Sequence, residues 1–452
     1  MSTKVISPNT QMMPVSARVS KEGHLLVGGC DTNELAESFG TPLWVVDYAT
    51  VEASAHALSS GLAGYTGGAR ALYAGKAMMC LALCKMTNQL GMGLDVVSAG
   101  ELYTALQAGL KPSDIYMHGN NKTPSELKMV VDNPGVTVIV DGFDELDLLI
   151  ELAREAKAPV EIMVRVTPGV EPETHEYIKT GQIDSKFGIS LGDVIPFLRR
   201  VEKNGNFVKF KGLHAHIGSQ SLELEPYLKV VDILSELCLE IKQELKLDVD
   251  KLNLGGGLGI VYVDSDKPLP LYEWSKAISN QVSKAFPEKG LNLPYLLVEP
   301  GRSVVGTAGI TLYRVGPCKK FQSGKLSASV DGGMADNPRP ATYNALYTAR
   351  LANRMDSPRP ENEVELVGRY CESGDIIIKD AGIPAEKGDL VAVFATGAYN
   401  YSMASNYNRT SRPACVLVKD GKAELIIKRE SLEDLIRQDL IPEFLKQDKR
   451  AE

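Results

Sequence analysis

The amino-acid sequence predicts an α/β fold in which a (β/α)8 barrel of the TIM type is joined to a second, mainly antiparallel β domain. Between about residues 70 and 300, short β-branched runs alternate with longer amphipathic segments eight times, as such a barrel requires. After Arg302 the runs favour strands, and Gly, Pro and Asp separate them. We therefore expect a barrel over residues 45–305 and a β domain built from residues 1–44 and 306–452. A doubly wound open sheet would also produce the first pattern.

The predicted barrel strands are eight short runs rich in Val, Ile and Leu. In chain order they are Arg70–Tyr73, Leu94–Val97, Ile115–Met117, Val136–Val140, Val160–Val166, Val208–His214, Lys251–Leu254 and Tyr295–Val298. Between them, apolar residues recur at the spacing of an amphipathic helix. The predicted helical segments are residues 100–110, 124–131, 144–156, 193–203, 227–245 and 271–286.

The second domain is predicted from seven further strand-like runs. They are Gly309–Val315, Leu326–Val330, Glu363–Val367, Ile376–Lys379, Leu390–Phe394, Ala414–Val418 and Ala423–Ile427. Near the N-terminus, HLLVGG and PLWVVD also favour strands, and we expect both to pair with this domain. A terminal helix should begin after Ser431 and be interrupted by Pro442.

Composition excludes several classes of protein. The chain has 452 residues, of which 57 are acidic and 49 are Lys or Arg, so its net charge is −8. This balance argues against nucleic acid or an anionic membrane as the main partner. No apolar run approaches the roughly 20 residues of a membrane-spanning helix, and the N-terminus lacks the apolar centre of a signal peptide. Seven scattered cysteines suit reduced thiols, so we expect a cytoplasmic protein.

Chemically active or glycine-rich groups follow each predicted barrel strand. In order they are Lys76, Asp95, His118, Asp141, Arg165, His216, the run Gly255–Gly257 and Glu299. Because barrel enzymes build their active sites at the carboxyl ends of the strands, this set is expected to converge on one pocket.

Two of these groups have both an ordinary and a chemical interpretation. Lys76, in LYAGKAMMC, is either a lysine whose charged end reaches solvent or a desolvated amine of lowered pKa suited to Schiff-base formation. The run LNLGGGLGI is either a tight turn or a phosphate cradle at the end of strand seven. Neither this run nor GMGLDVV has the G-x-G-x-x-G spacing of dinucleotide-binding proteins. The sequence therefore gives little support to a nicotinamide-dependent dehydrogenase.

Paired histidines and a strand-end acid extend the candidate site. His214 and His216 point to one face of a strand, which permits a metal site, but supporting ligands at suitable spacing are absent from the sequence and no metal is expected. A ring stacked on an aromatic cofactor suits this position equally. Glu299 ends an apolar strand, where a carboxylate needs a cationic partner such as a protonated pyridine nitrogen.

Ten motifs then occur in one order: YAGKA, GLDVVSAGEL, HGNNK, RVTPGV with THEYIKTGQIDSKFGI, GLHAHIGSQ, LNLGGGLG, VEPGRS, RPATY, CESGD and GAYNYSMASNYN. Together they resemble the barrel-type (fold type III) pyridoxal-phosphate-dependent amino-acid decarboxylases over about residues 40–410. The stretch Thr174–Ile189 and the SMASNYN segment resemble the diaminopimelate-acting branch more than its ornithine- and arginine-decarboxylating relatives. The resemblance implies pyridoxal 5'-phosphate as cofactor and conversion of meso-2,6-diaminopimelate to L-lysine and carbon dioxide, the last step of lysine biosynthesis.

The resemblance also implies roles around the cofactor. Lys76 would hold pyridoxal phosphate as a Schiff base, Glu299 would pair with the pyridine nitrogen, and His216 would stack on the ring. Asp95 and Arg165 would orient and tune the Schiff base. The implied phosphate-binding residues are Ser219, Gly255, Gly256, Gly257, Gly301 and Tyr399.

Further implied residues bind the substrate. The carboxylate-binding set is Arg302, Arg339 and Tyr343, with Tyr399 beside them. Cys371 and Glu372, in YCESGD, would enter the site across a homodimer interface. The cysteine would protonate the substrate carbon, and the glutamate would receive the distal ammonium group.

One residue departs from the family pattern. Relatives carry an asparagine two residues after the lysine, where this chain has Met78. The nearby Cys80 and Cys84 are expected to pack in the core.

Two kinds of alternative function stay open. The alternatives are a decarboxylase of ornithine, arginine or carboxynorspermidine, and a catalytically silent relative that binds pyridoxal phosphate.

Overall fold

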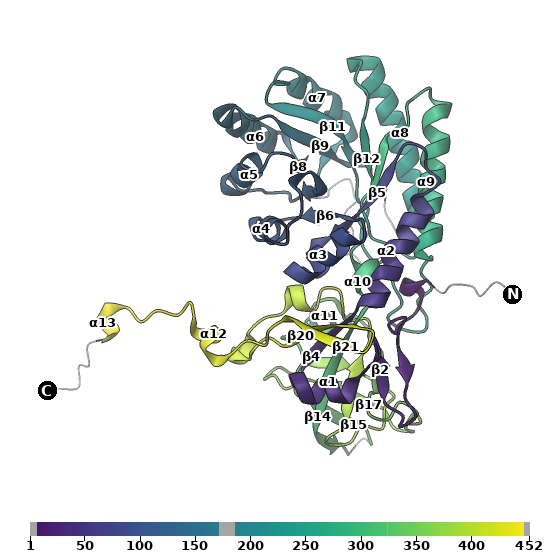
Figure 1. Ribbon diagram of the computed structural model, residues 1–452, viewed down its shortest axis with the longest axis vertical. Coiled ribbons are helices and arrows are strands. Elements are labelled where there is room, and N and C mark those ends of the chain that lie inside the picture. Colours follow the sequence, from purple (N-terminus) through teal and green to yellow (C-terminus); the bar gives the residue numbers. More distant parts are fainter. Residues whose placement is uncertain (1–6, 171–185, 323, 447–452) are drawn as a thin grey trace.

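The computed structural model describes residues 7–170, 186–322 and 324–446. A barrel ringed by helices lies against a β domain, and residues 432–446 extend away from that domain (Figure 1). The sequence stretch 174–189, used above for the family resemblance, lies outside the described residues except for its last four positions.

Eight parallel strands form the barrel, and the pairing of β8 with β9 closes it. They are β5 (Ala69–Ala74), β6 (Gly93–Val96), β7 (Ile115–Met117), β8 (Thr137–Val140), β9 (Val160–Thr167), β11 (Val208–His214), β12 (Lys251–Asn253) and β13 (Tyr295–Val298). Each predicted strand begins and ends within one residue of an observed one, so the strand prediction is confirmed. Closure also decides against the open sheet.

The barrel interior is filled rather than hollow below the strand ends. Five side chains from five different strands form a separate buried cluster: Leu72, Tyr116, Ile139, Met163 and Leu297. A much larger core lies between the strands and the helices. Because both faces of each strand are covered, β6, β7 and β8 are buried at every residue.

Helices cover the outside of the barrel (Figure 1). They are α2 (Tyr48–Leu62), α3 (Leu81–Gln89), α4 (Ala99–Gln107), α5 (Pro124–Val131), α6 (Phe143–Ala156), α7 (Val194–Glu202), α8 (Glu225–Leu245) and α9 (Leu271–Glu288). Local signals set several starts: Thr123 and Glu126 form a capping box on α5, and Ser98 caps α4. The predicted helix over 100–110 ends at Gln107, because the chain turns at Gly109, whose φ is 82°.

The β domain is a mixed, mainly antiparallel sheet. Its strands are β4 (Leu43–Asp47), β14 (Gly309–Lys320), β15 (Leu326–Val330), β16 (Ala349–Leu351), β17 (Val364–Val367), β18 (Ile376–Ile378), β19 (Leu390–Val393), β20 (Ala414–Lys419) and β21 (Lys422–Ile427). The N-terminal strand β4 lies between β14 and β20, far from both in sequence. Both chain ends therefore build this sheet, as predicted.

The segment HLLVGG does not join that sheet, which corrects one expectation. Its strand β2 (Leu25–Val27) pairs with β1 (Arg18–Val19) and β3 (Cys30–Asp31) in a separate three-stranded sheet. The apolar side chains of β2 nevertheless pack into one core with Leu43 of β4. Burial and isolated backbone hydrogen bonds, such as that of 2.7 Å from the Leu25 amide to the Ala352 carbonyl, thus attach this segment and the following α1 (Thr32–Phe39) to the domain.

Short elements complete the described chain. The remaining ones are β10 (Ile189–Ser190), α10 (Arg302–Val305), α11 (Arg339–Tyr343), α12 (Leu432–Ile436), α13 (Glu443–Lys446) and six 3-10 turns, including η2 (Gly75–Ala77). Ser431 caps α12, so the predicted start of the terminal helix is confirmed, but the helix ends at Ile436, before Pro442, and the separate α13 follows that proline. Among the described helices, none combines the length and apolar character needed to cross a bilayer.

The division at residues 45 and 305 stays a prediction. The strands follow it closely, but β4 belongs to the second sheet as far as Asp47.

Candidate active site

The carboxyl ends of the barrel strands surround a cavity of about 680 Å³. Ten of the predicted site residues line it: Lys76, Asp95, Arg165, His216, Ser219, Glu299, Arg302, Arg339, Tyr343 and Tyr399. Residues from the β domain close one side, because Arg339 and Tyr343 belong to α11. Of the eight groups expected at the strand ends, Lys76, Asp95, His118, Arg165, His216 and Glu299 line this cavity, whereas Asp141 and the run Gly255–Gly257 do not.

Lys76 projects into this cavity from η2, directly after β5. A hydrogen bond of 2.7 Å from the Tyr73 hydroxyl to the Met78 carbonyl fixes the backbone around it. Protein atoms surround Lys76 on most sides. Its side chain is nevertheless solvent-accessible, because it faces the open cavity. Among the described residues, none accepts a hydrogen bond from its Nζ, which leaves the amine available for a covalent partner.

The predicted direction of the Lys76 pKa is wrong. Burial alone would lower the pKa of the ammonium group, but nearby Tyr399, Asp95 and Glu299 together raise it above its usual value. The sequence indicated desolvation and gave no measure of the acidic groups that the barrel brings beside the amine.

Glu299 is the best-connected acid of the pocket. Its Oε1 accepts a hydrogen bond of 2.6 Å from Asn253 and lies 2.8 Å from His118 Nε2, and its Oε2 lies 3.2 Å from His214 Nε2. Burial alone would raise the pKa of this carboxyl, but His118 and His214 lower it well below its usual range. Glu299 is therefore an anion at neutral pH, ready to pair with a cationic ring nitrogen.

Sequence reasoning placed His118 at a strand end and His214 on one strand face with His216, and it missed Asn253. The structure brings all three onto Glu299, and the two imidazole rings meet edge to face at 4.8 Å. Ligand atoms of His118, His214 and Glu299 lie within 4.8 Å of one another, a spacing that a metal ion also tolerates. The donor Asn253 on the same carboxylate favours a hydrogen-bonded acid.

Asp95 faces His118 from β6. Its Oδ1 lies 3.7 Å from His118 Nε2 and is buried without a hydrogen-bond partner among the described residues. Burial raises the pKa of the Asp95 carboxyl above its usual value, although His118 opposes that change. An orphaned acceptor beside Lys76 and Glu299 fits a site built for a polar ligand.

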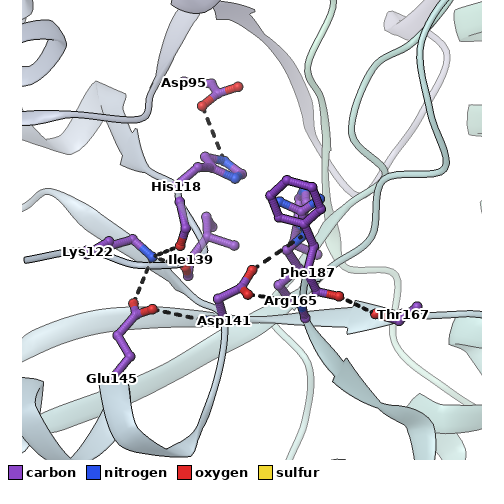
Figure 2. A network of polar contacts seen from close by, with 12 residues as sticks. Asp95, His118, Lys122, Ile139, Asp141, Glu145, Arg165, Thr167 and Phe187 are labelled. Atoms are coloured by element: carbon purple, nitrogen blue, oxygen red, sulfur yellow. Dashed lines mark hydrogen bonds and ion pairs between the residues drawn. The ribbon is translucent and has the colours of Figure 1, made fainter. Parts of the chain in front are cut away.

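Arg165 is held at the end of β9 by the network shown in Figure 2. Asp141 Oδ1 lies 3.8 Å from Arg165 Nε, and Asp141 Oδ2 accepts a hydrogen bond of 3.0 Å from the Gly188 amide. The guanidinium lies over the Phe187 ring at 4.3 Å. Asp141 thereby links Arg165 at the end of β9 to the backbone at Gly188.

Lys122, in HGNNK, extends this network to two further strand ends (Figure 2). Its buried Nζ donates hydrogen bonds to the carbonyls of Gly119 (2.8 Å) and Ile139 (2.7 Å) and to Glu145 Oε1 (2.7 Å). The Glu145 carboxylate in turn accepts from the Asp141 amide at 3.3 Å. The loop after His118 is thus fixed to β8 and α6, although the sequence gave Lys122 no role.

The run Gly255–Gly257 lies beside the cavity, and none of its three residues lines the cavity. A Cβ on Gly256 would collide with the Glu299 carbonyl oxygen, and one on Gly257, whose φ is 103°, would collide with the Gly218 carbonyl oxygen. Gly301 likewise approaches Ala74 closely. These glycines let the ends of β11, β12, β13 and β5 meet closely around the pocket.

Arg302 and Arg339 are both buried, and within the described part of the chain neither pairs with a carboxylate. Instead, both guanidiniums donate to the hydroxyl of Tyr262, Arg302 at 2.6 Å and Arg339 at 2.9 Å. Arg302 also donates to Ser219 Oγ at 3.0 Å, and Arg339 to the Tyr347 hydroxyl at 2.7 Å. Buried cations without an anionic partner mark a site for an anionic ligand.

Sequence reasoning missed Tyr262, which lines the cavity, and Tyr347, which packs against Tyr262 but does not line it. Tyr262 lies in the loop that continues the glycine run, so its position was the one available signal. His216 and Tyr399 both line the cavity, as predicted. His216 Nδ1 accepts a hydrogen bond from the Gly256 amide at 3.3 Å. The centre of the Tyr399 ring lies 4.7 Å from the Arg302 guanidinium.

Besides the glycines, Cys371 and Glu372 are predicted site residues that do not line the cavity of their own chain. Both are exposed, and neither lines it. The Glu372 carboxylate accepts a hydrogen bond from the Tyr407 hydroxyl, and the Cys371 amide donates to Asn408 at 3.4 Å. The two residues are therefore presented on the outer surface of the β domain.

Met78, Cys80 and Cys84 all pack in or against the core of the barrel. Met78 and Cys84 are buried in the large barrel core, and Cys80 packs against it. The prediction that these cysteines belong to the core is confirmed.

Comparisons with known proteins agree with this fold and site. The family described as "Pyridoxal-dependent decarboxylase, pyridoxal binding domain" matches residues 49–306. A diaminopimelate decarboxylase of Synechocystis sp. is 44% identical over 97% of this chain and 95% of its own, and one of Halalkalibacterium halodurans is 43% identical over 94% and 97%. The crystal structure of diaminopimelate decarboxylase from M. jannaschii in complex with L-lysine has a TM-score of 0.89 and 32% identity, covering 97% of this chain and 100% of that one.

The closed barrel, its strand-end lysine and acid, and the matched domain define a pyridoxal-dependent decarboxylase of the barrel type. Within that class, the full-length relatives are decisive. The chain belongs to the diaminopimelate decarboxylase family.

Proposed function

We propose that this chain decarboxylates meso-2,6-diaminopimelate to L-lysine and carbon dioxide at the mouth of the barrel. The observation that carries this proposal is the pair of buried guanidiniums, Arg302 and Arg339, without a carboxylate partner in the described chain, on the same cavity as Lys76. A second anion site beside the cofactor is needed for a substrate that keeps one carboxylate after losing the other. The related M. jannaschii structure contains L-lysine, the product of this reaction.

The residues around the cavity suit pyridoxal phosphate. Lys76 offers an amine with no hydrogen-bond acceptor among the described residues, and Glu299 offers an anionic carboxylate for the ring nitrogen. Ser219 Oγ offers a hydrogen-bond donor for the phosphate, with Gly301 and Tyr399 beside it. Within the glycine run, the Gly255 amide donates to Asn253 Oδ1 at 3.0 Å and the Gly256 amide to His216 Nδ1 at 3.3 Å, so the Gly257 amide is the one that we assign to the phosphate. When bound, pyridoxal phosphate supplies an electron sink for the pair left by the departing carboxylate.

The protein's own groups then position and protonate the substrate. His216 would lie against the cofactor ring, with Asp95 and Arg165 at its edge. Arg302, Arg339, Tyr343 and Tyr399 would hold the unreacted carboxylate and so turn the reacting bond out of the ring plane. The carbon that loses carbon dioxide gains one proton, which we assign to the Cys371 thiol of a second subunit, while that subunit's Glu372 receives the distal ammonium group.

This assignment makes the enzyme a homodimer with sites at the interface. Support comes from the exposure of Cys371 and Glu372 and from the apolar side chains that the terminal arm leaves in solvent, such as Leu440 and Phe444. The cytoplasmic location expected from composition stays a prediction.

Carbon dioxide release from a panel of substrates tests the function. With pyridoxal phosphate present, meso-2,6-diaminopimelate should be converted to lysine at least about 100-fold more efficiently than ornithine, arginine or carboxynorspermidine, because only it satisfies both arginines. Faster turnover of one of those three would assign the alternative substrate. Cofactor binding without any turnover would identify a silent relative.

A further inference from the structure

One hydroxyl group, that of Tyr262, joins two cations from different domains. Arg302 begins α10 at the barrel mouth, and Arg339 begins α11 in the β domain. Each directs Nη1 to the Tyr262 oxygen, at 2.6 and 2.9 Å. This shared acceptor therefore sets the separation of the two guanidiniums at the cavity wall.

Tyr262 is itself fixed from three sides. Its amide donates to Asp266 Oδ2 at 2.8 Å, and its carbonyl accepts from Thr348 Oγ1 at 2.9 Å. Its ring meets that of Tyr347 edge to face, with centroids 5.4 Å apart and planes at 86°. The hydroxyl consequently has one defined position, and long arginine side chains that would otherwise sample many rotamers are held to it.

The contact of the Tyr262 hydroxyl with both guanidiniums also reduces the repulsion between two positive charges. Two guanidiniums close together repel each other, and inside the described chain no carboxylate is paired with either. Burial alone would raise the pKa of the Tyr262 phenol, but the charges of Arg302 and Arg339 lower it below its usual value. A phenol oxygen that carries partial negative charge offsets the repulsion while it leaves the remaining N–H groups for a ligand.

We propose that Tyr262 is a positioning residue for the substrate, which holds Arg302 and Arg339 together so that both face the carboxylate retained by the product. The inference rests on the proposed function, since it assigns that carboxylate to this arginine pair. Holding both guanidiniums in place before the substrate arrives lowers the ordering cost of binding.

The test compares two ligands that differ by one carboxylate. L-Lysine and cadaverine share the same diamine chain, and calorimetry gives their dissociation constants for the holoenzyme. The Tyr262→Phe substitution should weaken L-lysine binding roughly 10-fold or more, and cadaverine binding by less than about 2-fold. In turnover of meso-2,6-diaminopimelate, KM should rise by a similar factor while kcat stays within about 3-fold.

A matched control removes a buried tyrosine hydroxyl elsewhere. Tyr65 donates to the Pro294 carbonyl at 2.6 Å and lies outside the cavity lining, so Tyr65→Phe should leave both dissociation constants unchanged. Equal weakening of L-lysine and cadaverine by Tyr262→Phe would mean a general loss of structure and would overturn the proposal. Tighter L-lysine binding would also overturn it, because Tyr262 would then compete with the carboxylate.

Two further measurements separate other sources of failure. A fall in pyridoxal phosphate affinity larger than the fall in L-lysine affinity would assign the pair to the phosphate and overturn the assignment to substrate. Near-ultraviolet titration of the cofactor-free protein needs no ligand: one tyrosine should ionise below the usual range, and Tyr262→Phe should abolish that step. If carbon dioxide release fails but this step is present, the proposed function fails while the arginine–tyrosine contact stands; absence of the step overturns the contact.

Discussion

At the scale of single residues, the pocket is a set of ionisable groups whose chemistry depends on their neighbours. Lys76 combines burial, which favours the neutral amine, with nearby acids, which favour the ammonium ion, and the acids prevail. Glu299 is surrounded by His118, His214 and Asn253, so it stays anionic although it is buried. The amine must therefore lose a proton before it could form the proposed covalent bond, whereas the buried carboxylate is already charged and can pair with a cation.

Replacing Lys76 tests the first of these roles. The Lys76→Ala protein should lose the visible absorbance of a covalently held pyridoxal phosphate that borohydride removes in the wild type. Turnover should fall by at least about 1,000-fold, since a nucleophilic amine cannot be replaced by a methyl group. Absorbance spectra before and after borohydride provide the measurement, and an unchanged reducible absorbance would assign the covalent link to another residue.

At the scale of elements, the loop between β15 and α11 carries Arg339 to the barrel and is held by buried acids. Asp336 accepts hydrogen bonds from the Tyr313 hydroxyl on β14 and from the Gly333 amide, the latter at 2.9 Å. Asp375 accepts from the Met334 amide at 2.7 Å, which joins this loop to the one that bears Cys371. Asp375 therefore links the position of Arg339, which we propose binds the substrate, to that of the proposed proton donor.

The Asp336 anchor predicts a pH dependence of stability. Burial raises the pKa of Asp336 to about 7, against an ordinary value of about 4. A raised folded-state pKa means that the folded protein binds this proton more tightly, so the stability that it contributes is full below about pH 4 and is lost as the pH rises through about 7. The free energy of unfolding should fall over this range by up to about 4 kcal/mol on account of this group.

Urea unfolding at about pH 5 and about pH 8 measures this effect. The wild type should lose more stability than Asp336→Asn between the two conditions, because the amide keeps an acceptor for Tyr313 and carries no titrating proton. Parallel losses in the two proteins would show that Asp336 does not titrate in this range.

At the scale of the whole molecule, the two domains and a second subunit each supply part of the proposed site. The barrel provides the cofactor pocket and the β domain closes it with Arg339 and Tyr343. Cys371 and Glu372 are exposed on the same chain. The arm of α12 and α13 extends from the β domain (Figure 1), and its apolar side chains, such as Leu440 and Phe444, are exposed. Two copies related by a two-fold axis would satisfy both features.

Mixed dimers test the shared site. Lys76→Ala and Cys371→Ala proteins should each be nearly inactive, and the cysteine variant should keep its cofactor. A dimer with one of each subunit contains one intact site, so isolated heterodimers should recover about half of the wild-type carbon dioxide release. Two affinity tags permit their purification. Heterodimers as inactive as their parents would place Cys371 and Lys76 of each site on the same chain.

The sequence by itself determined the barrel, its strand ends and the groups placed there. Strand positions follow from the local alternation of β-branched runs with amphipathic segments. The residues at the eight strand ends can then be read directly from the sequence, whatever the arrangement of the rest of the chain. Short motifs around Lys76, Glu299 and Cys371 carried the family resemblance for the same reason, since neighbours in sequence stay neighbours in space.

Only the tertiary structure decided how these groups act on one another. Tyr262 meets Arg302 and Arg339 across separations of 40 and 77 residues, and β4 enters the middle of a sheet formed by the other end of the chain. The direction of the Lys76 pKa likewise depends on acids from other strands. Contacts of this kind arise from the packing of distant segments, which leaves no periodic signal in the sequence, whereas hydrophobic periodicity does.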